Sequence, residues 1–198
     1  MNDVFKKLNN ISLPENTPVY HRGSTTEDKI KPTDPAISVM TDLKKVKAIT
    51  VSPLLAIDDA LQLMITAEVR MLLVVDNDTM LIGVITSRDV MGEKPVVYAS
   101  QERLSHDQIL VANIMTPREQ VEALSIDDVC SAQVGDIVAT LRDSSRQHAL
   151  VMESDANGGG RVRGLFSITH IGRLLGIEIQ PTGIVQSFAE LESILVRD

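Results

Sequence analysis

A hydroxyl residue and an acidic residue, three positions apart, follow an apolar run near the middle of the sequence. Thr86 and Asp89 come after Gly83-Val84-Ile85, a pattern typical of a buried strand that turns into a helix. Free N–H groups at a helix start, with a Thr86 hydroxyl beside them, suit a phosphate. The Asp89 carboxylate is able to accept two hydrogen bonds from a ribose diol. Taken alone, the same residues are also typical of a simple helix cap.

The motif occurs a second time in altered form. Ser167 and His170 follow Gly164-Leu165-Phe166, at positions equivalent to Thr86 and Asp89. A neutral imidazole offers one hydrogen-bond acceptor at most, so His170 lacks the two acceptors of a carboxylate. The duplication, more than either motif alone, favours a nucleotide site that is present twice.

Few other residues have types and spacing that indicate chemistry. Arg88 and Arg146 are candidate cations for drawing in a phosphate, although each is also typical of a solvated surface charge. Cys130 is the single cysteine and has no strong positive neighbour in the sequence to activate it as a nucleophile. We find no nucleophile–base pair, acid/base carboxylate pair or metal-ligand spacing. The sequence therefore predicts a protein that is not an enzyme and that requires no cofactor or metal.

Composition limits the classes of partner. The 198 residues carry a net charge of −8, with 3% aromatic residues and no Trp, which argues against a nucleic-acid partner. The N-terminus does not lead into an apolar segment of signal-peptide length, and the longest apolar runs are strand-sized. We therefore expect a cytoplasmic protein with no membrane partner.

The motif belongs to a longer internal repeat. Val39-Met40-Thr41 is matched by Ile114-Met115-Thr116, and apolar residues at helical spacing begin at Ile57 and again at Val134. An aliphatic run, a turn, the motif strand and a short helix follow in each copy. Each repeat is therefore predicted as strand, helix, strand, strand and helix, which gives a mixed α/β (α+β) fold.

The repeats divide the chain into four parts. Pro and Gly clusters mark an N-terminal arm, and the sequence does not decide whether this arm is docked or mobile. A capping box at Ser187 opens a final helix, which docks on the body or on a symmetry mate, or else binds a partner. The predicted parts are an extended arm (1–36), the first repeat with the start of a polar linker (37–100), the second repeat (101–178) and a tail with a short helix (179–198).

The chain resembles the cystathionine-beta-synthase (CBS) domain family, in the form of a tandem CBS pair standing alone. The resemblance covers about residues 37–178. It rests on Met-Thr before the first strand, a helix ending in Leu63-Met64, an apolar run into Val74-Val75-Asp76, and the Gly-x-x-Thr-x-x-Asp motif. It implies two repeats packed as a pseudo-two-fold pair and a homodimer. It also implies a ligand in the cleft between the repeats: AMP, ADP, ATP or S-adenosylmethionine.

The resemblance also implies which residues contact such a ligand. Thr86 contacts phosphate and Asp89 ribose, with the backbone around Ile49 and Thr50 beside the adenine. Ser167 keeps the hydroxyl role in the second site. Arg70, Met71 and Leu72 form the wall of the first pocket, and Leu124 and Ser125 flank the second site. With the two candidate cations, the full set of candidate residues is Ile49, Thr50, Arg70, Met71, Leu72, Thr86, Arg88, Asp89, Leu124, Ser125, Arg146, Ser167 and His170.

Two functions from different classes agree with this sequence. The first is a regulatory module that senses an adenine nucleotide or adenosyl ligand between its repeats and signals to a protein partner. The alternative is a dimerisation or scaffold module that needs no ligand. Binding of any one nucleotide distinguishes the two functions, because the scaffold module is expected to bind no nucleotide.

Overall fold

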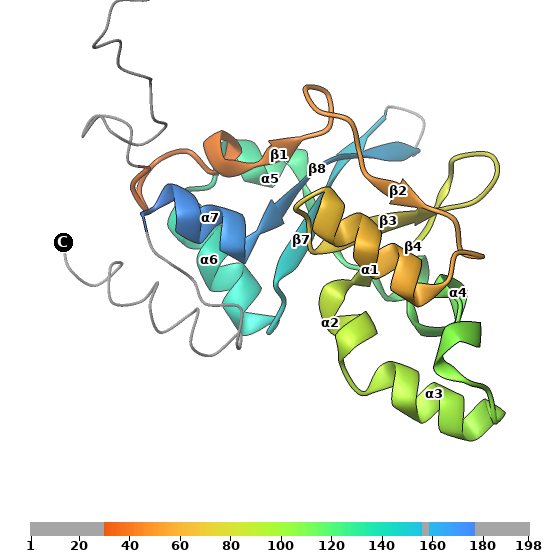
Figure 1. Ribbon diagram of the computed structural model, residues 1–198. Helices are drawn as coiled ribbons and strands as arrows, with labels where there is room; N and C mark the ends of the chain where they lie inside the picture. The colour runs from red at the N-terminus through yellow and green to blue at the C-terminus, as the bar shows by residue number, and fades with distance from the viewer. Residues whose placement is uncertain (1–29, 156–158, 177–198) are drawn as a thin grey trace, which may run out of the picture.

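The computed structural model describes residues 30–155 and 159–176 of the chain. Figure 1 shows the two repeats beside each other, with α1–α4 on one side and α5–α7 on the other. Three predictions lie outside the described residues. They concern the arm before residue 30, the part of the second repeat's turn at residues 156–158, and the helix that begins near Ser187.

The first repeat has the predicted order of elements. Apolar residues on one face of its long helix, Ile57, Ala60 and Met64, are buried, as the helical spacing requires. The elements are β2 (Thr50–Val51), α1 (Ile57–Thr66), β3 (Met71–Val75), β4 (Leu81–Thr86) and α2 (Ser87–Met91).

The second repeat confirms the same order and adds one helix. That helix, α5 (Ile126–Ser131), begins at Ser125, whose hydroxyl accepts a 3.2 Å hydrogen bond from the Asp127 amide. The repeated elements are β6 (Ala123–Ser125), α6 (Val134–Asp143), β7 (His148–Ser154), β8 (Gly160–Ser167) and α7 (Ile168–Leu174).

The stretch predicted as a polar linker is not irregular: it contains a helix. In α3 (Lys94–Glu102), Pro95 lies in the first turn, where its missing N–H breaks no helical bond. Tyr98 packs against the first core, and its hydroxyl accepts a 2.8 Å hydrogen bond from the Asn113 amide group. The shorter elements are η1 (Ala36–Val39), η2 (His106–Gln108), α4 (Val111–Ile114) and η3 (Arg118–Gln120).

The two repeats exchange their edge strands. Each Met-Thr dipeptide leads into a two-residue strand, β1 (Thr41–Asp42) or β5 (Thr116–Pro117). β1 pairs with β8 of the second repeat, and β5 pairs with β4 of the first. The sheets therefore have the orders β2-β3-β4-β5 and β1-β8-β7-β6. Each sheet is completed by a strand that precedes the other repeat in the sequence.

Glycine is required where each exchanged strand pairs with the strand of the other repeat. A Cβ atom on Gly83 would lie 2.6 Å from the Thr116 carbonyl oxygen, and one on Gly164 would lie 2.8 Å from that of Thr41. Both contacts are with backbone, which cannot rotate away. The two glycines of the repeated motif are therefore needed for the close approach of the other repeat.

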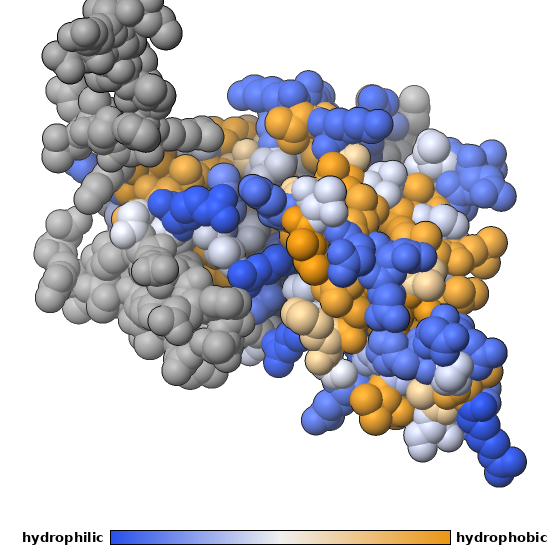
Figure 2. Space-filling view, in the orientation of Figure 1, coloured by the Kyte–Doolittle hydropathy of each residue, from blue (hydrophilic) through white to orange (hydrophobic). Residues whose placement is uncertain are grey.

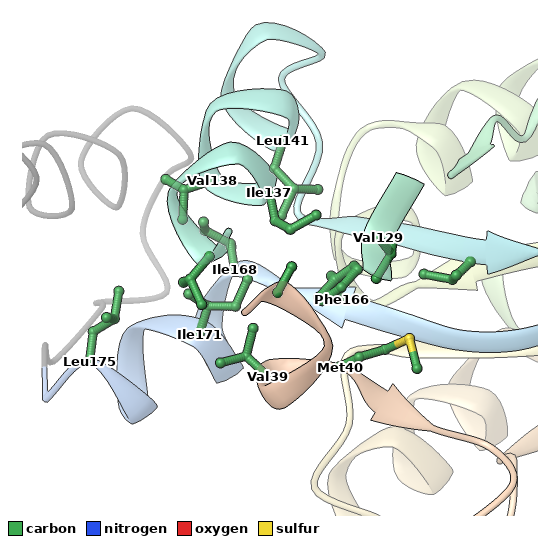
Figure 3. Packing of buried hydrophobic residues seen from close by; sticks show 13 residues of the cluster. Val39, Met40, Val129, Ile137, Val138, Leu141, Phe166, Ile168, Ile171 and Leu175 are labelled. Carbon is green, nitrogen blue, oxygen red and sulfur yellow. The ribbon is translucent and has the colours of Figure 1, made fainter. Parts of the chain in front are cut away.

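The exchange continues into the hydrophobic cores. Figure 3 shows Val39 and Met40 beside Phe166 and Ile171, residues of the second repeat. Phe166 is fully buried there. In the same way, residues that precede the second Met-Thr pack into the core of the first repeat: Ile109, Val111 and Ile114. Each core therefore depends on chain from both halves of the sequence.

A third apolar cluster joins the two repeats. Met71, Leu73 and Val84 of the first repeat pack with Leu150 of the second. All four are at most 9% exposed. The faces of the two sheets therefore meet along β3, β4 and β7, and the predicted pairing of the repeats is observed.

An ion pair fixes the first exchanged strand. The Arg163 guanidinium donates to both carboxylate oxygens of Asp42, with distances of 3.0 Å from Nε and 2.8 Å from the terminal nitrogen. The Lys44 amide also donates to Asp42. These hydrogen bonds, and above all that from Arg163, lower the Asp42 pKa from 3.8 to about 2.

Candidate functional site

Two cavities lie between the repeats. The larger has a volume of about 1010 Å³ and the smaller about 260 Å³. Met71 and Arg88 of the first repeat line both cavities, as do Gln147 and His148 of the second. These four side chains therefore form a wall, which we call the shared wall.

The larger cavity brings together predicted residues from both repeats. Ile49 and Arg70 come from the segments that precede β2 and β3. Ser167 and His170 come from the end of β8 and the start of α7. A volume of about 1010 Å³ is at the upper end of what small-molecule sites use.

The smaller cavity contains the other motif. Thr86 and Asp89 line it with Arg88, and Glu122 and Arg146 line it from the second repeat. The Arg146 guanidinium lies 2.9 Å from the Glu122 carboxylate. The two cations of this cavity are therefore accompanied by two carboxylates, and one of these, Glu122, forms a direct ion pair with a cation of the cavity.

The structure groups the candidate residues differently from the sequence analysis. Ile49 was expected beside Thr86 and Asp89, but it lines the larger cavity with Ser167 and His170. The reason is the packing of the repeats, in which the start of the first strand of one repeat lies opposite the motif turn of the other. Each cavity is therefore built from a motif of one repeat and a strand start of its partner.

Four candidate residues line neither cavity. Leu72 is fully buried in the first core, and Leu124 packs against the second. Thr50 is exposed beside β3, and the Ser125 hydroxyl caps α5. The wall role expected of Leu72 and the flanking roles expected of Leu124 and Ser125 do not agree with these places. Thr50 was expected to contribute only its backbone.

Sequence reasoning missed two cations of the larger cavity, Lys47 and Arg173. Arg173 follows His170 by three residues on α7, so the helical spacing carried a signal. Lys47 is one of several charges in a polar loop, and nothing in its surroundings distinguishes it.

The Thr86–Asp89 motif forms a complete capping box. The Asp89 carboxylate accepts hydrogen bonds of 2.9 Å from the Thr86 amide and 2.6 Å from the Thr86 hydroxyl. Its other oxygen lies 2.6 Å from the Lys94 ammonium group. Both carboxylate oxygens are therefore already engaged within the protein, and the helix-cap interpretation describes the geometry of this motif.

The second motif does not form this cap. Ser167 occupies the position before α7, and its side chain makes no capping hydrogen bond. The Ser167 side chain and that of His170 both line the larger cavity. The hydroxyl that the sequence placed beside a ligand is thus not committed to its own helix.

The larger cavity is rich in positive charge. Lys47, Arg70, Arg88 and Arg173 line it, against the single carboxylate of Glu68. Within residues 30–155 and 159–176, none of the four cations forms one of the observed ion pairs. The cavity therefore offers unneutralised cations in a protein whose net charge is −8.

His148 is held neutral in the shared wall. Burial above all, together with the nearby Arg70 guanidinium, lowers its pKa from 6.5 to about 4, and the Asp89 carboxylate opposes both effects. Its imidazole therefore adds no charge to either cavity near neutral pH. The positive charge of the larger cavity comes from its lysine and arginines.

The described part of the chain contains neither a cluster of metal ligands nor a helix that could span a membrane. No group of three or more His, Cys, Asp or Glu residues there is arranged to hold a metal ion. None of its helices combines the length and apolar character that a membrane span needs.

The chain was compared with known proteins. The sequence model of the CBS domain family matches residues 36–95. No curated protein matches the sequence closely enough to count as a relative. Among solved structures, an uncharacterised conserved protein from Pyrococcus horikoshii is 20% identical, with 73% of this chain and 93% of that chain covered and a TM-score of 0.52.

A CBS-domain-containing protein from Agrobacterium tumefaciens is 19% identical, with 79% of this chain and 98% of that chain covered and a TM-score of 0.52. The structure of CBSX2 in complex with AMP is 22% identical over 71% of this chain and 94% of that chain, with a TM-score of 0.48. The first two likenesses establish the fold.

The fold and the cavities define a module of two small α/β repeats that exchange edge strands. With the family match, residues 36–95 are a CBS domain, and the chain has the fold of a tandem CBS pair.

Proposed function

We propose that this protein is a regulatory module that binds an adenine nucleotide or an adenosyl ligand between its repeats and signals to a protein partner. The observation that carries this proposal is the larger cavity, which combines a volume of about 1010 Å³ with unpaired cations. Such a site suits a ligand that has both an apolar ring and an anionic group.

The lining of the larger cavity agrees with that chemistry. Met64, Val69 and Leu73 supply apolar surface for a base, while Arg70 and Arg173 supply donors for an anion. The two repeats contribute to one cavity, so a ligand there contacts both. Such a ligand shifts the packing of the repeats if it binds one arrangement more tightly than another.

The partners that we infer are a small molecule and a protein. The net charge of −8 still argues against nucleic acid. Exposed apolar residues lie on three helices of the first repeat, Ile65 on α1, Met91 on α2 and Val96 on α3, each at least 60% exposed. Figure 2 shows hydrophobic surface over this part of the molecule. This surface supports a homodimer or a protein partner.

The test is calorimetric titration of the full chain with AMP, ADP, ATP and S-adenosylmethionine. Thr169→Trp places a large ring in the larger cavity, while Thr66→Trp places the same ring on an exposed position of α1 outside both cavities. We expect at least one ligand to bind, Thr169→Trp to abolish the binding and Thr66→Trp to preserve it. Equal binding by both variants would contradict the assignment of the site.

A ligand-independent scaffold is the second candidate. It is favoured by one observation, the internal saturation of Asp89 by Thr86 and Lys94. A scaffold predicts a folded dimer that binds none of the four compounds. Light scattering after gel filtration shows whether the dimer forms, and the titration of that dimer distinguishes the scaffold from the sensor.

A further inference from the structure

The two cavities differ in how their charges are balanced. In the larger one, four cations from separate segments face one carboxylate: Lys47 before β2, Arg70 before β3, Arg88 on α2 and Arg173 on α7. In the smaller one, Arg146 is neutralised by Glu122 at 2.9 Å, and Arg88, which lines this cavity as well, is offset by the Asp89 carboxylate in the same lining. Only the larger cavity therefore presents an excess of positive charge to a ligand.

This excess amounts to about three unit charges at neutral pH, because His148 is uncharged there and Glu68 offsets one cation. A ligand with a single phosphate carries at most two negative charges, so it would leave part of this excess unbalanced. A second or third phosphate would bring further anionic oxygens to guanidinium groups, which bind such oxygens in bidentate fashion.

The larger cavity also lacks the group that was expected to read ribose. Its motif has His170 at the position equivalent to Asp89, and an imidazole cannot accept two hydrogen bonds from a diol. Glu68, the single carboxylate of the lining, is exposed and follows the end of α1. Its place at the solvent boundary leaves no enclosed carboxylate for the diol.

From these observations we propose that the larger cavity selects an adenine nucleotide with two or more phosphates and does not discriminate for the ribose diol. The proposal rests on the proposed nucleotide-binding function and names the ligand class of that site. The protein's own cations take the place that a metal counter-ion has in other sites, so the metal-free nucleotide is the preferred ligand.

The experiment is calorimetric titration of the full chain in metal-free buffer with AMP, ADP, ATP and 2′-deoxy-ADP. We expect ADP and ATP to bind at least about tenfold more tightly than AMP, which corresponds to one additional charge-assisted contact. We expect 2′-deoxy-ADP to bind within about threefold of ADP, and inorganic tripolyphosphate to displace ADP.

Charge variants test the cations directly. Arg70→Gln and Arg173→Gln remove one charge each from the larger cavity, and Arg161→Gln removes one from an exposed position of β8 that lines neither cavity. All three change the net charge equally, so a general field effect would be the same for each. We expect the first two to weaken ADP by at least about tenfold and Arg161→Gln by less than about twofold.

The outcomes separate this inference from the proposed function. Binding of AMP as tight as that of ADP, or a loss above about tenfold on removal of the 2′-hydroxyl, overturns the inference and leaves the nucleotide-binding function standing. Tighter binding in the presence of Mg²⁺ overturns it as well. If no adenine nucleotide binds to the folded chain, the proposed function falls, and this inference falls with it.

Discussion

His148 connects the two cavities at the scale of a single residue. It belongs to the shared wall, with Arg70 and Asp89 as the charges that act on it. Its counterpart in the first repeat is Met71, which pairs with Thr86 as His148 pairs with Ser167. Because the apolar Met71 occupies the position equivalent to His148, the fold does not require a charged side chain there.

The depressed pKa of His148 makes a pH prediction. The pKa falls from 6.5 in the unfolded chain to about 4 in the folded one, so the unfolded state binds the proton more tightly. Stability should therefore decrease as the pH falls from about 6.5 towards 4, and be insensitive to this group above 6.5. Urea unfolding at several pH values, with the His148 pKa measured by NMR, checks this.

The control is His148→Gln, which keeps a polar side chain but cannot titrate. We expect this variant to lose the part of the pH dependence between about 6.5 and 4. Asp42 loses its contribution at lower pH, from its unfolded pKa of 3.8 down to about 2, so the two effects are separable. An unchanged profile in the variant, or an NMR pKa near 6.5, would contradict the account of His148.

At the scale of elements, the repeated motif serves the contact between repeats. Gly83 on β4 and Gly164 on β8 leave room for β5 and β1, and the Met-Thr dipeptides supply those strands. Two signatures that lie far apart in the sequence therefore describe one contact, made twice.

Gly83→Ala should destabilise the protein. The added Cβ would lie 2.6 Å from the Thr116 carbonyl oxygen, so β5 has to move away from β4. We expect a loss of about 1–3 kcal/mol, the usual cost of overpacking, measured by urea unfolding. Gly159→Ala is the matched control, because its Cβ would meet only the end of the Asp155 side chain. Equal losses in both variants would show that the close approach of β5 to β4 does not explain the effect.

The elements themselves were largely predictable. Helical spacing identified α1 and α6, and aliphatic runs identified β3 and β7, because burial of one face imposes those periods. α3 was missed because only a few of its residues contact the core, so its composition resembles that of a linker. β1 and β5 were missed as strands since two residues carry no periodicity.

The site was less predictable than the fold, for a reason at the scale of the whole molecule. Each cavity combines the motif of one repeat with the start of a strand from the other repeat. This combination depends on how the two repeats face each other, and no local sequence pattern encodes their relative orientation. Ile49 was accordingly assigned to the wrong neighbours. Whether a cation is neutralised depends on which side chains lie near it in space. The spacing of Arg173 after His170 could therefore indicate its position on the helix but not its lack of an ion pair within the described residues, and Lys47 was not distinguishable from a surface charge.

The exchange of strands makes the whole molecule one cooperative unit. Fragments 1–104 and 105–198 would each lack one edge strand of their sheet. Each would also lack core residues: the first fragment lacks Ile114, and the second lacks Val39, which packs beside Phe166. We expect neither fragment to show a cooperative thermal transition by circular dichroism, and the full chain to unfold in one transition.

Mixing the two fragments provides the control, because it restores every contact of the described fold except one peptide bond. We expect the mixture to regain a cooperative transition. A fragment that unfolds cooperatively by itself, at the temperature of the full chain, would show that the repeats are independent.

The exchange of edge strands also bears on how such a chain arises by duplication. In a single ancestral repeat, the Met-Thr strand could not pair within its own sheet, and no strand would lie against its glycine. Two copies would therefore have to associate for each sheet to gain its edge strand. Fusion of the genes would then preserve an association that already existed. After fusion the two glycine contacts remain under constraint, whereas the positions now held by Asp89 and His170, which line two differently charged cavities, are free to diverge.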